Sequence, residues 1–154
     1  MSDWKRVTKE VPFESLRPEI GEAIKKHIEQ YNLGAILADE LRCIQTDSEK
    51  IKKPLFGSAE IVYTGAVITA HWLMWAVSCT KTQTAVLSAQ LGDVIVQDYA
   101  QTRFAKMVPD SGIQVSGKFT DVSENGSAFI GLDESSAAIK FKETVLRVVQ
   151  DVKR

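Results

Sequence analysis

The sequence has only two cysteine and two histidine residues, which are too few to assemble a zinc-binding pattern. The cysteines, Cys43 and Cys79, are far apart and form no CxxC motif. In a cytoplasmic protein such thiols stay reduced, and we expect both to be small core residues. The sequence therefore predicts no metal site and no disulfide.

An excess of charge of one sign is also missing. The 154 residues include 19 Lys and Arg and 20 Asp and Glu, which gives a net charge of -1. Proteins that bind nucleic acids normally carry a basic excess on a domain or a face. We therefore expect no nucleic-acid partner.

Long apolar segments are absent as well. The longest nearly apolar run, AVITAHWLMWAV, covers residues 66–77 and is interrupted by Thr69 and His71. At twelve residues it is too short to span a bilayer. The first residues, MSDWKRVTKEVPF, lack the apolar core of a secretory signal. These observations predict a cytoplasmic protein without a transmembrane segment.

Motifs that mark catalysis or phosphate binding are missing too. No GxSxG, GxGxxG or GxxxxGK[ST] pattern occurs, and neither His27 nor His71 is flanked by a recognisable catalytic partner. Asp93 and Asp98 are five residues apart on one predicted strand, so they should point to opposite faces. We predict no catalytic residue, no cofactor and no enzymatic activity.

The composition is typical of one soluble globular domain, with 44% hydrophobic and 25% charged residues. The first third of the sequence reads as helical. Ser15 can cap a helix, Pro18 suits an early helical position, and Asn32 and Gly34 can end it. Apolar residues recur at helical spacing between them, at Ile20, Ile24, Ile28 and Tyr31. Residues 1–35 are therefore predicted to be an N-terminal helical extension.

Short strand patterns dominate from residue 36 onward. They are rich in β-branched and aromatic residues and are separated by short turns. Asn125-Gly126 is typical of a tight hairpin, and Gly65 and Gly117 inside strand patterns indicate a bulge or bend. Seven strands are predicted, of which the clearest are AEIVYTGAVI, HWLMWAVSC, TAVLSAQL, DVIVQDY, GIQVSGKFT and SAFIGL.

A second amphipathic helix is predicted at the C-terminal end, capped by Asp133 or Ser135. Its apolar stripe consists of Ala138, Phe141, Val145, Val148, Val149 and Val152. One helix, seven closely spaced strands and one helix indicate an antiparallel barrel or sandwich, because βαβ units need a crossover helix between strands.

This order of elements resembles the pleckstrin-homology-like (PH-like) barrel over about residues 36–152. The resemblance implies a mainly β (α+β) fold, a seven-stranded antiparallel barrel whose open end is capped by the C-terminal helix. That helix lacks the tryptophan typical of eukaryotic members, and residues 1–35 have no counterpart in the minimal barrel. Both departures suit bacterial PH-like domains of unknown function. Residues 36–154 are accordingly assigned to the barrel, in one compact domain with the extension.

The segment EKIKKPLFG, residues 49–57, would join the first two strands of such a barrel. Phosphoinositide-binding members place basic residues in this loop and an arginine on the second strand. Here the lysines are present, but the following AEIVYTGAV has no basic residue. The loop is either a solvated connection or a docking site for anionic membrane or an acidic ligand. The candidate binding residues are Lys50, Lys52, Lys53 and Phe56.

Trp72 and Trp75 are three residues apart on one predicted strand and should face opposite sides of it. One would then belong to the core, and the other would be an anchor for a partner or for the N-terminal helix. The alternative is that both tryptophans serve core packing.

We therefore predict a non-enzymatic PH-like binding or scaffolding module that acts through protein contacts or self-association as a homo-oligomer. The alternative function is peripheral binding to anionic membrane or an acidic ligand through residues 49–57. A small-ligand carrier that uses the barrel mouth ranks third, and an enzyme without recognisable motifs ranks last.

Overall fold

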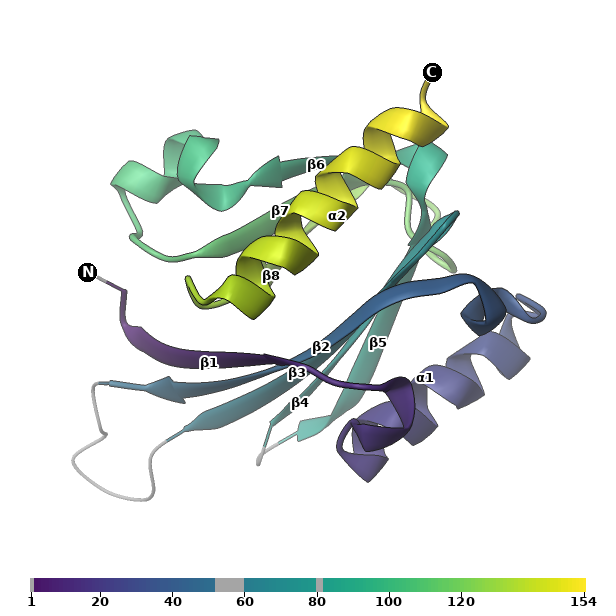
Figure 1. Ribbon diagram of the computed structural model, residues 1–154, viewed down its shortest axis with the longest axis horizontal. Helices are drawn as coiled ribbons and strands as arrows, with labels where there is room; N and C mark the ends of the chain where they lie inside the picture. Colours follow the sequence, from purple (N-terminus) through teal and green to yellow (C-terminus); the bar gives the residue numbers. More distant parts are fainter. Residues whose placement is uncertain (1, 52–59, 80–81) are drawn as a thin grey trace.

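The computed structural model describes residues 2–51, 60–79 and 82–154. These residues form two antiparallel sheets and two α helices (Figure 1). Sheet A has the order β1-β2-β3-β4-β5, with bounds Trp4–Glu10, Glu40–Lys50, Ile61–Thr69, Trp72–Cys79 and Thr82–Gln90. Sheet B has the order β6-β7-β8, with bounds Val94–Asp98, Gly112–Gly117 and Gly126–Gly131. The helices are α1 (Pro18–Gln30) and α2 (Ser136–Val152).

The predicted mainly β class is confirmed, but the predicted closed, seven-stranded barrel is not what the described residues form. They make eight strands in two sheets, and the additional strand is β1. This strand pairs along its whole length with β2, from Trp4 opposite Lys50 to Glu10 opposite Ile44. The segment predicted to be a helical extension thus contains an edge strand of sheet A as well as α1.

Helix α1 covers one face of sheet A, where it contacts β3, β4 and β5. Ile20 and Ile24 are fully buried there. Gly65 of β3 makes this packing possible, because a Cβ at that position would lie 2.6 Å from Cγ2 of Ile20. The predicted end of the helix is confirmed, since Asn32 and Gly34 have left-handed φ values of 52° and 77°.

The main core lies between the two sheets and α2. Helix α2 contacts β1 and β2 of sheet A and β6 of sheet B, and in Figure 1 it crosses between the sheets. Phe141 and Val145 are fully buried in this core, as the predicted apolar stripe requires, whereas Val152 is exposed. The Oγ atom of Ser135 accepts a hydrogen bond from the N–H of Ala138, so Ser135 caps the helix.

The predicted tight hairpin at Asn125-Gly126 is wrong. Strands β7 and β8 are joined by residues 118–125, and Gly126 is already the first residue of β8. The left-handed residue of this connection is Asp121, with φ 65°. Its course is determined by tertiary contacts, since the Phe119 side chain is buried in the main core.

Three further short helical turns lie around sheet B: η3 (Leu91–Asp93), η4 (Tyr99–Gln101) and η5 (Arg103–Lys106). Two others, η1 (Phe13–Ser15) and η2 (Ile36–Asp39), flank α1. Among the described residues, no helix has the length and apolar character needed to cross a membrane.

Candidate functional site

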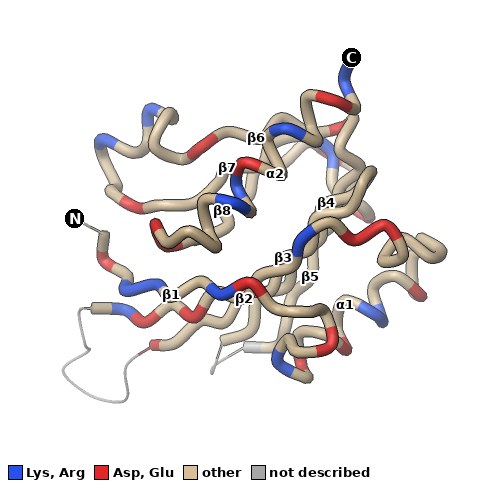
Figure 2. Tube along the Cα trace, viewed as in Figure 1, with Lys and Arg blue, Asp and Glu red and all other residues tan. Residues whose placement is uncertain are grey.

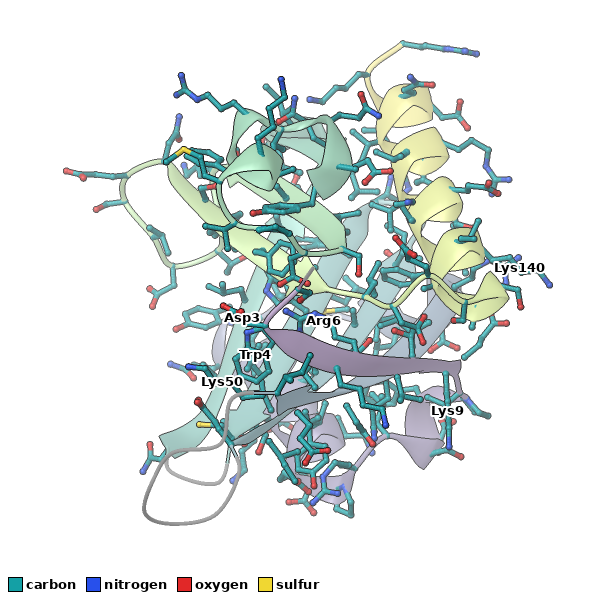
Figure 3. All side chains as sticks on the ribbon, turned by 90° about the vertical axis from the view of Figure 1, so that its left-hand side faces the viewer. Asp3, Trp4, Arg6, Lys9, Lys50 and Lys140 are labelled. Atoms are coloured by element: carbon teal, nitrogen blue, oxygen red, sulfur yellow. The ribbon has the colours of Figure 1, made fainter. Side chains whose placement is uncertain are left out.

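Of the four candidate residues in the 49–57 loop, the structure places Lys50. It is the last residue of β2, and its ammonium nitrogen lies 5.9 Å from the centre of the Trp4 ring, a cation–π contact (Figure 3). Lys52, Lys53 and Phe56 lie outside the described residues. Docking through this loop therefore stays a prediction.

The two candidate tryptophans have different surroundings. Trp75 is buried in the main core, where its ring meets the Phe119 ring edge-to-face with centroids 5.7 Å apart. Trp72 is the first residue of β4, lies opposite Gln90 of β5, and is half-buried. Trp72 is thus the one of the pair that reaches the surface.

The tight turn between β3 and β4 holds Trp72 in place. The buried hydroxyl of Thr69 accepts hydrogen bonds from the backbone N–H groups of His71 and Trp72, at 3.3 and 2.9 Å. On the other side, the carbonyl of His71 accepts a hydrogen bond from the N–H of Leu91. Side chains that bind backbone groups in this way stabilise the turn, so these hydrogen bonds fix the backbone position of Trp72.

A groove of about 560 Å³ opens beside Trp72. Its walls come from three regions that are distant in sequence: the segment after α1, the β4–β5 edge with η3, and the β7–β8 connection. The lining residues are Leu33, Trp72, Gln90, Asp93, Lys118, Phe119, Thr120, Asp121, Val122 and Ser123. This set, called here the Trp72 groove, combines large apolar residues with exposed charged residues of both signs.

The wall formed by the β7–β8 connection is held on three sides. Phe119 inserts into the main core, and the N–H of Thr120 donates to the carbonyl of Ser88 on β5 at 2.8 Å. The Asp121 carboxylate accepts a hydrogen bond from the Tyr31 hydroxyl, just after α1, at 2.7 Å. A connection fastened to the core, to β5 and to the end of α1 presents a preformed surface.

A chain of hydrogen-bonded polar groups, two of them buried, joins this wall to α1 and β5. The His27 Nε2 atom is 2.7 Å from the Ser88 hydroxyl, which donates in turn to the Thr120 hydroxyl at 2.7 Å. This direction places the proton of a neutral His27 on Nε2. Burial lowers the pKa of His27, and the Asp121 carboxylate offsets part of this effect. A neutral imidazole therefore joins α1 to β5.

The His27–Ser88 pair resembles a nucleophile and base in spacing alone. The Ser88 side chain is fully buried, so a substrate cannot reach its oxygen. His71 is exposed in the β3–β4 turn, and the Asp98 carboxylate is paired with the Lys142 ammonium at 2.8 Å.

Within the described ranges, no group of three His, Cys, Asp or Glu side chains lies close enough together to hold a metal ion. Burial raises the pKa of the Cys43 thiol to about 12, which keeps it unreactive.

Sequence reasoning missed a polar cluster between the two sheets. The Arg6 guanidinium of β1 binds both carboxylate oxygens of Asp110, which precedes β7, and donates to the Ser48 hydroxyl of β2 at 2.6 Å. Nearby, the Asp133 carboxylate accepts the N–H of Thr8, and the Thr8 hydroxyl accepts the N–H of Asp133. Trp4, Arg6 and Thr8 lie at every second position, as residues on one face of a strand do. This alternation was the sequence pattern from which an inward-facing polar cluster on β1 could have been inferred.

The pairs in this cluster join sheet A to sheet B and to the start of α2. Every carboxylate in it is already hydrogen-bonded by a neighbouring protein group, so the cluster fastens the fold rather than presenting reactive groups. Comparison with protein-family models, with curated proteins and with solved structures gives no match to this chain.

Proposed function

We propose that this chain is a non-enzymatic, PH-like binding module that contacts a protein, a second copy of itself or another chain, through the Trp72 groove. The order of elements supports the PH-like part of the proposal. Strands β2–β5 form a four-stranded meander and β6–β8 a three-stranded meander, and α2 follows and packs against both sheets. The resemblance implies the same order of seven strands followed by one helix, and β1 and α1 precede this part of the chain.

The observation that carries the binding role is the half-buried Trp72 beside a groove of about 560 Å³. Tryptophan is enriched among the residues that contribute most to protein–protein binding, because it buries a large area with little loss of side-chain freedom. The rim groups Lys118, Asp93 and Asp121 offer both charge signs around it, as the polar rim of an interface does.

A binding role rather than catalysis is also supported by how the titratable groups are used. His27 holds α1 to β5, Asp133 holds β1 to α2, and Asp98 pairs with Lys142. Each of these contacts joins two elements of the fold. Such use accounts for these residues without a reaction.

The test is light scattering over a concentration series, with Trp72→Ala as the variant and Leu41→Ala as the matched control. Leu41 is an exposed apolar residue of β2 outside the groove. Self-association that increases with concentration, weakens in Trp72→Ala and persists in Leu41→Ala would support a second copy as the partner.

A strict monomer throughout the series would remove self-association and leave a different protein as the partner. Crosslinking in cell extract would then compare the wild type with Trp72→Ala. Identical crosslinked species for both proteins would count against the groove as the contact site.

A further inference from the structure

A second surface feature lies away from the Trp72 groove, in η5 and the two residues that follow it. This segment, residues 103–108, is called here the basic–apolar turn. Met107, Val108 and Phe104 have 80%, 58% and 47% of their surface exposed. Three large apolar side chains exposed within five residues form a patch, and such patches on soluble proteins mark contact sites.

The exposure of these side chains is built into the backbone. The hydroxyl of the buried Tyr99 donates to the carbonyl of Val108 at 2.5 Å and lies 3.4 Å from that of Phe104. The Thr102 hydroxyl donates to the carbonyl of Tyr99 at 2.7 Å. Tyr99 itself packs edge-to-face on the Phe129 ring. The inward groups of the turn are thus occupied, and Phe104, Met107 and Val108 are directed to solvent.

The charge of the turn has one sign. Arg103 and Lys106 alternate with the apolar residues, and no acidic residue occurs between Asp98 and Asp110. Figure 2 shows the two basic positions on this connection, with acidic positions only at its ends. Those two acids are neutralised elsewhere, since Asp98 pairs with Lys142 and Asp110 with Arg6. The turn therefore presents a net charge of two positive units.

We propose that the basic–apolar turn docks onto an anionic phospholipid membrane. Phe104, Met107 and Val108 would enter the boundary between head groups and acyl chains, while the two cations meet lipid phosphate and carboxylate groups. Apolar side chains flanked by Lys and Arg give this kind of interfacial binding, and anionic lipid supplies the matching charge. The favoured occupant is a membrane rather than a protein, because the turn projects from the fold (Figure 1) and its charged residues are all basic.

The location of the turn leaves the Trp72 groove accessible. In Figure 1, η4 and η5 project at the left of the view, whereas the 118–125 connection that forms one wall of the groove lies at the right. A membrane-bound molecule could therefore hold a protein partner at its other end. The two proposals rest on different residues and are tested separately.

One nearby group opposes the proposed docking. Glu134 is exposed, and it lines a cavity of about 350 Å³ together with Pro109, the residue after the turn. A carboxylate beside an anionic surface is repelled by it. Glu134→Gln should therefore strengthen binding to anionic vesicles, whereas a protein contact has no general reason to respond in this way.

The experiment is co-sedimentation with phosphatidylcholine vesicles, with and without phosphatidylserine. The test variant is Arg103→Gln/Lys106→Gln, and the control is Lys26→Gln/Lys153→Gln, which removes the same charge from exposed positions on α1 and at the C-terminal end. Wild type should bind only the phosphatidylserine vesicles, and less so as salt increases. Each basic residue near an anionic surface contributes about a factor of five, so the test variant should bind about 25-fold more weakly.

The apolar contribution is tested by Phe104→Ser/Met107→Ser against Leu41→Ser. Because both altered residues are exposed, the variant should keep the wild-type melting temperature while losing most vesicle binding. Should this double variant fail to fold, Met107→Ser alone, at the most exposed position of the turn, replaces it.

Failure of the wild type to sediment with phosphatidylserine vesicles would overturn the proposal, as would equal binding to both vesicle types. Unchanged binding of the test variants would also overturn it. If they instead abolish self-association in light scattering while no vesicle binding occurs, the turn is a protein contact.

Discussion

Arg6 and Asp110 lie 104 residues apart in sequence and form a bidentate, nearly buried ion pair between the sheets. The Arg6 Nε atom is 3.0 Å from Oδ1 of Asp110, and Nη2 is 2.6 Å from Oδ2. The Arg6 guanidinium also makes cation–π contacts with the rings of Trp4 and Phe129, whose centres each lie 5.5 Å from its Cζ atom. Figure 3 shows Arg6 beside Trp4 at the end of the molecule where β1 begins.

Replacing Arg6 with alanine should be strongly destabilising, because the Asp110 carboxylate would remain buried without its partner. The expected loss in free energy of unfolding is about 3–5 kcal/mol, measured by urea denaturation. Arg6→Ala/Asp110→Ala should cost less than the sum of the single changes. Arg154→Ala is the control, because its pair with Asp151 is exposed and 4.0 Å long, and it should cost less than about 0.5 kcal/mol. A similarly small loss for Arg6→Ala would show that the pair does not fasten the sheets.

Gly131→Ala should disrupt the same pair from the other side. A Cβ at position 131 would lie 2.3 Å from the Arg6 Nη1 atom and 2.4 Å from Cζ, so the guanidinium would have to move. We expect a loss of about 1–3 kcal/mol in urea denaturation, and a smaller loss when Arg6 is already alanine. Gly21→Ala on α1 meets no atom within 4 Å and should stabilise the helix by up to about 1 kcal/mol. Equal losses for Gly131→Ala in both backgrounds would exclude the clash as the cause.

The stability of the protein should fall on acidification through the titration of His27. Burial lowers the pKa of this imidazole below its ordinary value of 6.5, so unfolding takes up a proton below that pH. The stability that depends on a neutral His27 is fully present above about pH 6.5, and it is lost as the pH falls below that value. His27→Gln should flatten the change in urea midpoint between about pH 7 and pH 5, and the exposed His71→Gln should leave it as in wild type. An equally steep change in His27→Gln would assign the effect to other groups.

Replacing Trp75 with alanine should reduce the free energy of unfolding more than replacing Trp72. Trp75→Ala removes a buried ring that packs on Phe119 and should cost about 3–5 kcal/mol in free energy of unfolding. Trp72→Ala should cost less than half of that, because its ring is already partly in solvent. Thermal and urea unfolding of both variants provide the comparison. A loss for Trp72→Ala as large as for Trp75→Ala would make Trp72 a core residue and would count against the groove as a contact surface.

Helix periodicity was the most reliable signal in the sequence. The stripe of Ile20 and Ile24 and the stop at Asn32 and Gly34 predicted α1, and the C-terminal stripe predicted α2, because each helix buries a continuous apolar face. Strand β1 could not be predicted in the same way. Its inward side chains include Arg6 and Thr8, whose burial depends on partners more than a hundred residues later.

The Trp72 groove also depends on contacts between residues that are distant in sequence, and such contacts could not be predicted. Trp72 was identified as a candidate from its position relative to Trp75, but the groove around it comes from three separate regions of the chain. The local hairpin rule at Asn125-Gly126 failed for a related reason, since the burial of Phe119 and the hydrogen bond of Thr120 favour a longer connection. The basic–apolar turn was not singled out from the sequence, because its exposure follows from the contacts of Tyr99.

The contacts of β1 also have a consequence for biosynthesis. A ribosome releases Arg6 and Thr8 long before it releases Asp110 and Asp133, the residues that hold their side chains in the finished protein. Strand β1 can pair with β2 early, yet it cannot be locked until the last part of the chain has emerged. Until then, residues 4–10 are held mainly by their pairing with β2 and stay more accessible to chaperones and proteases.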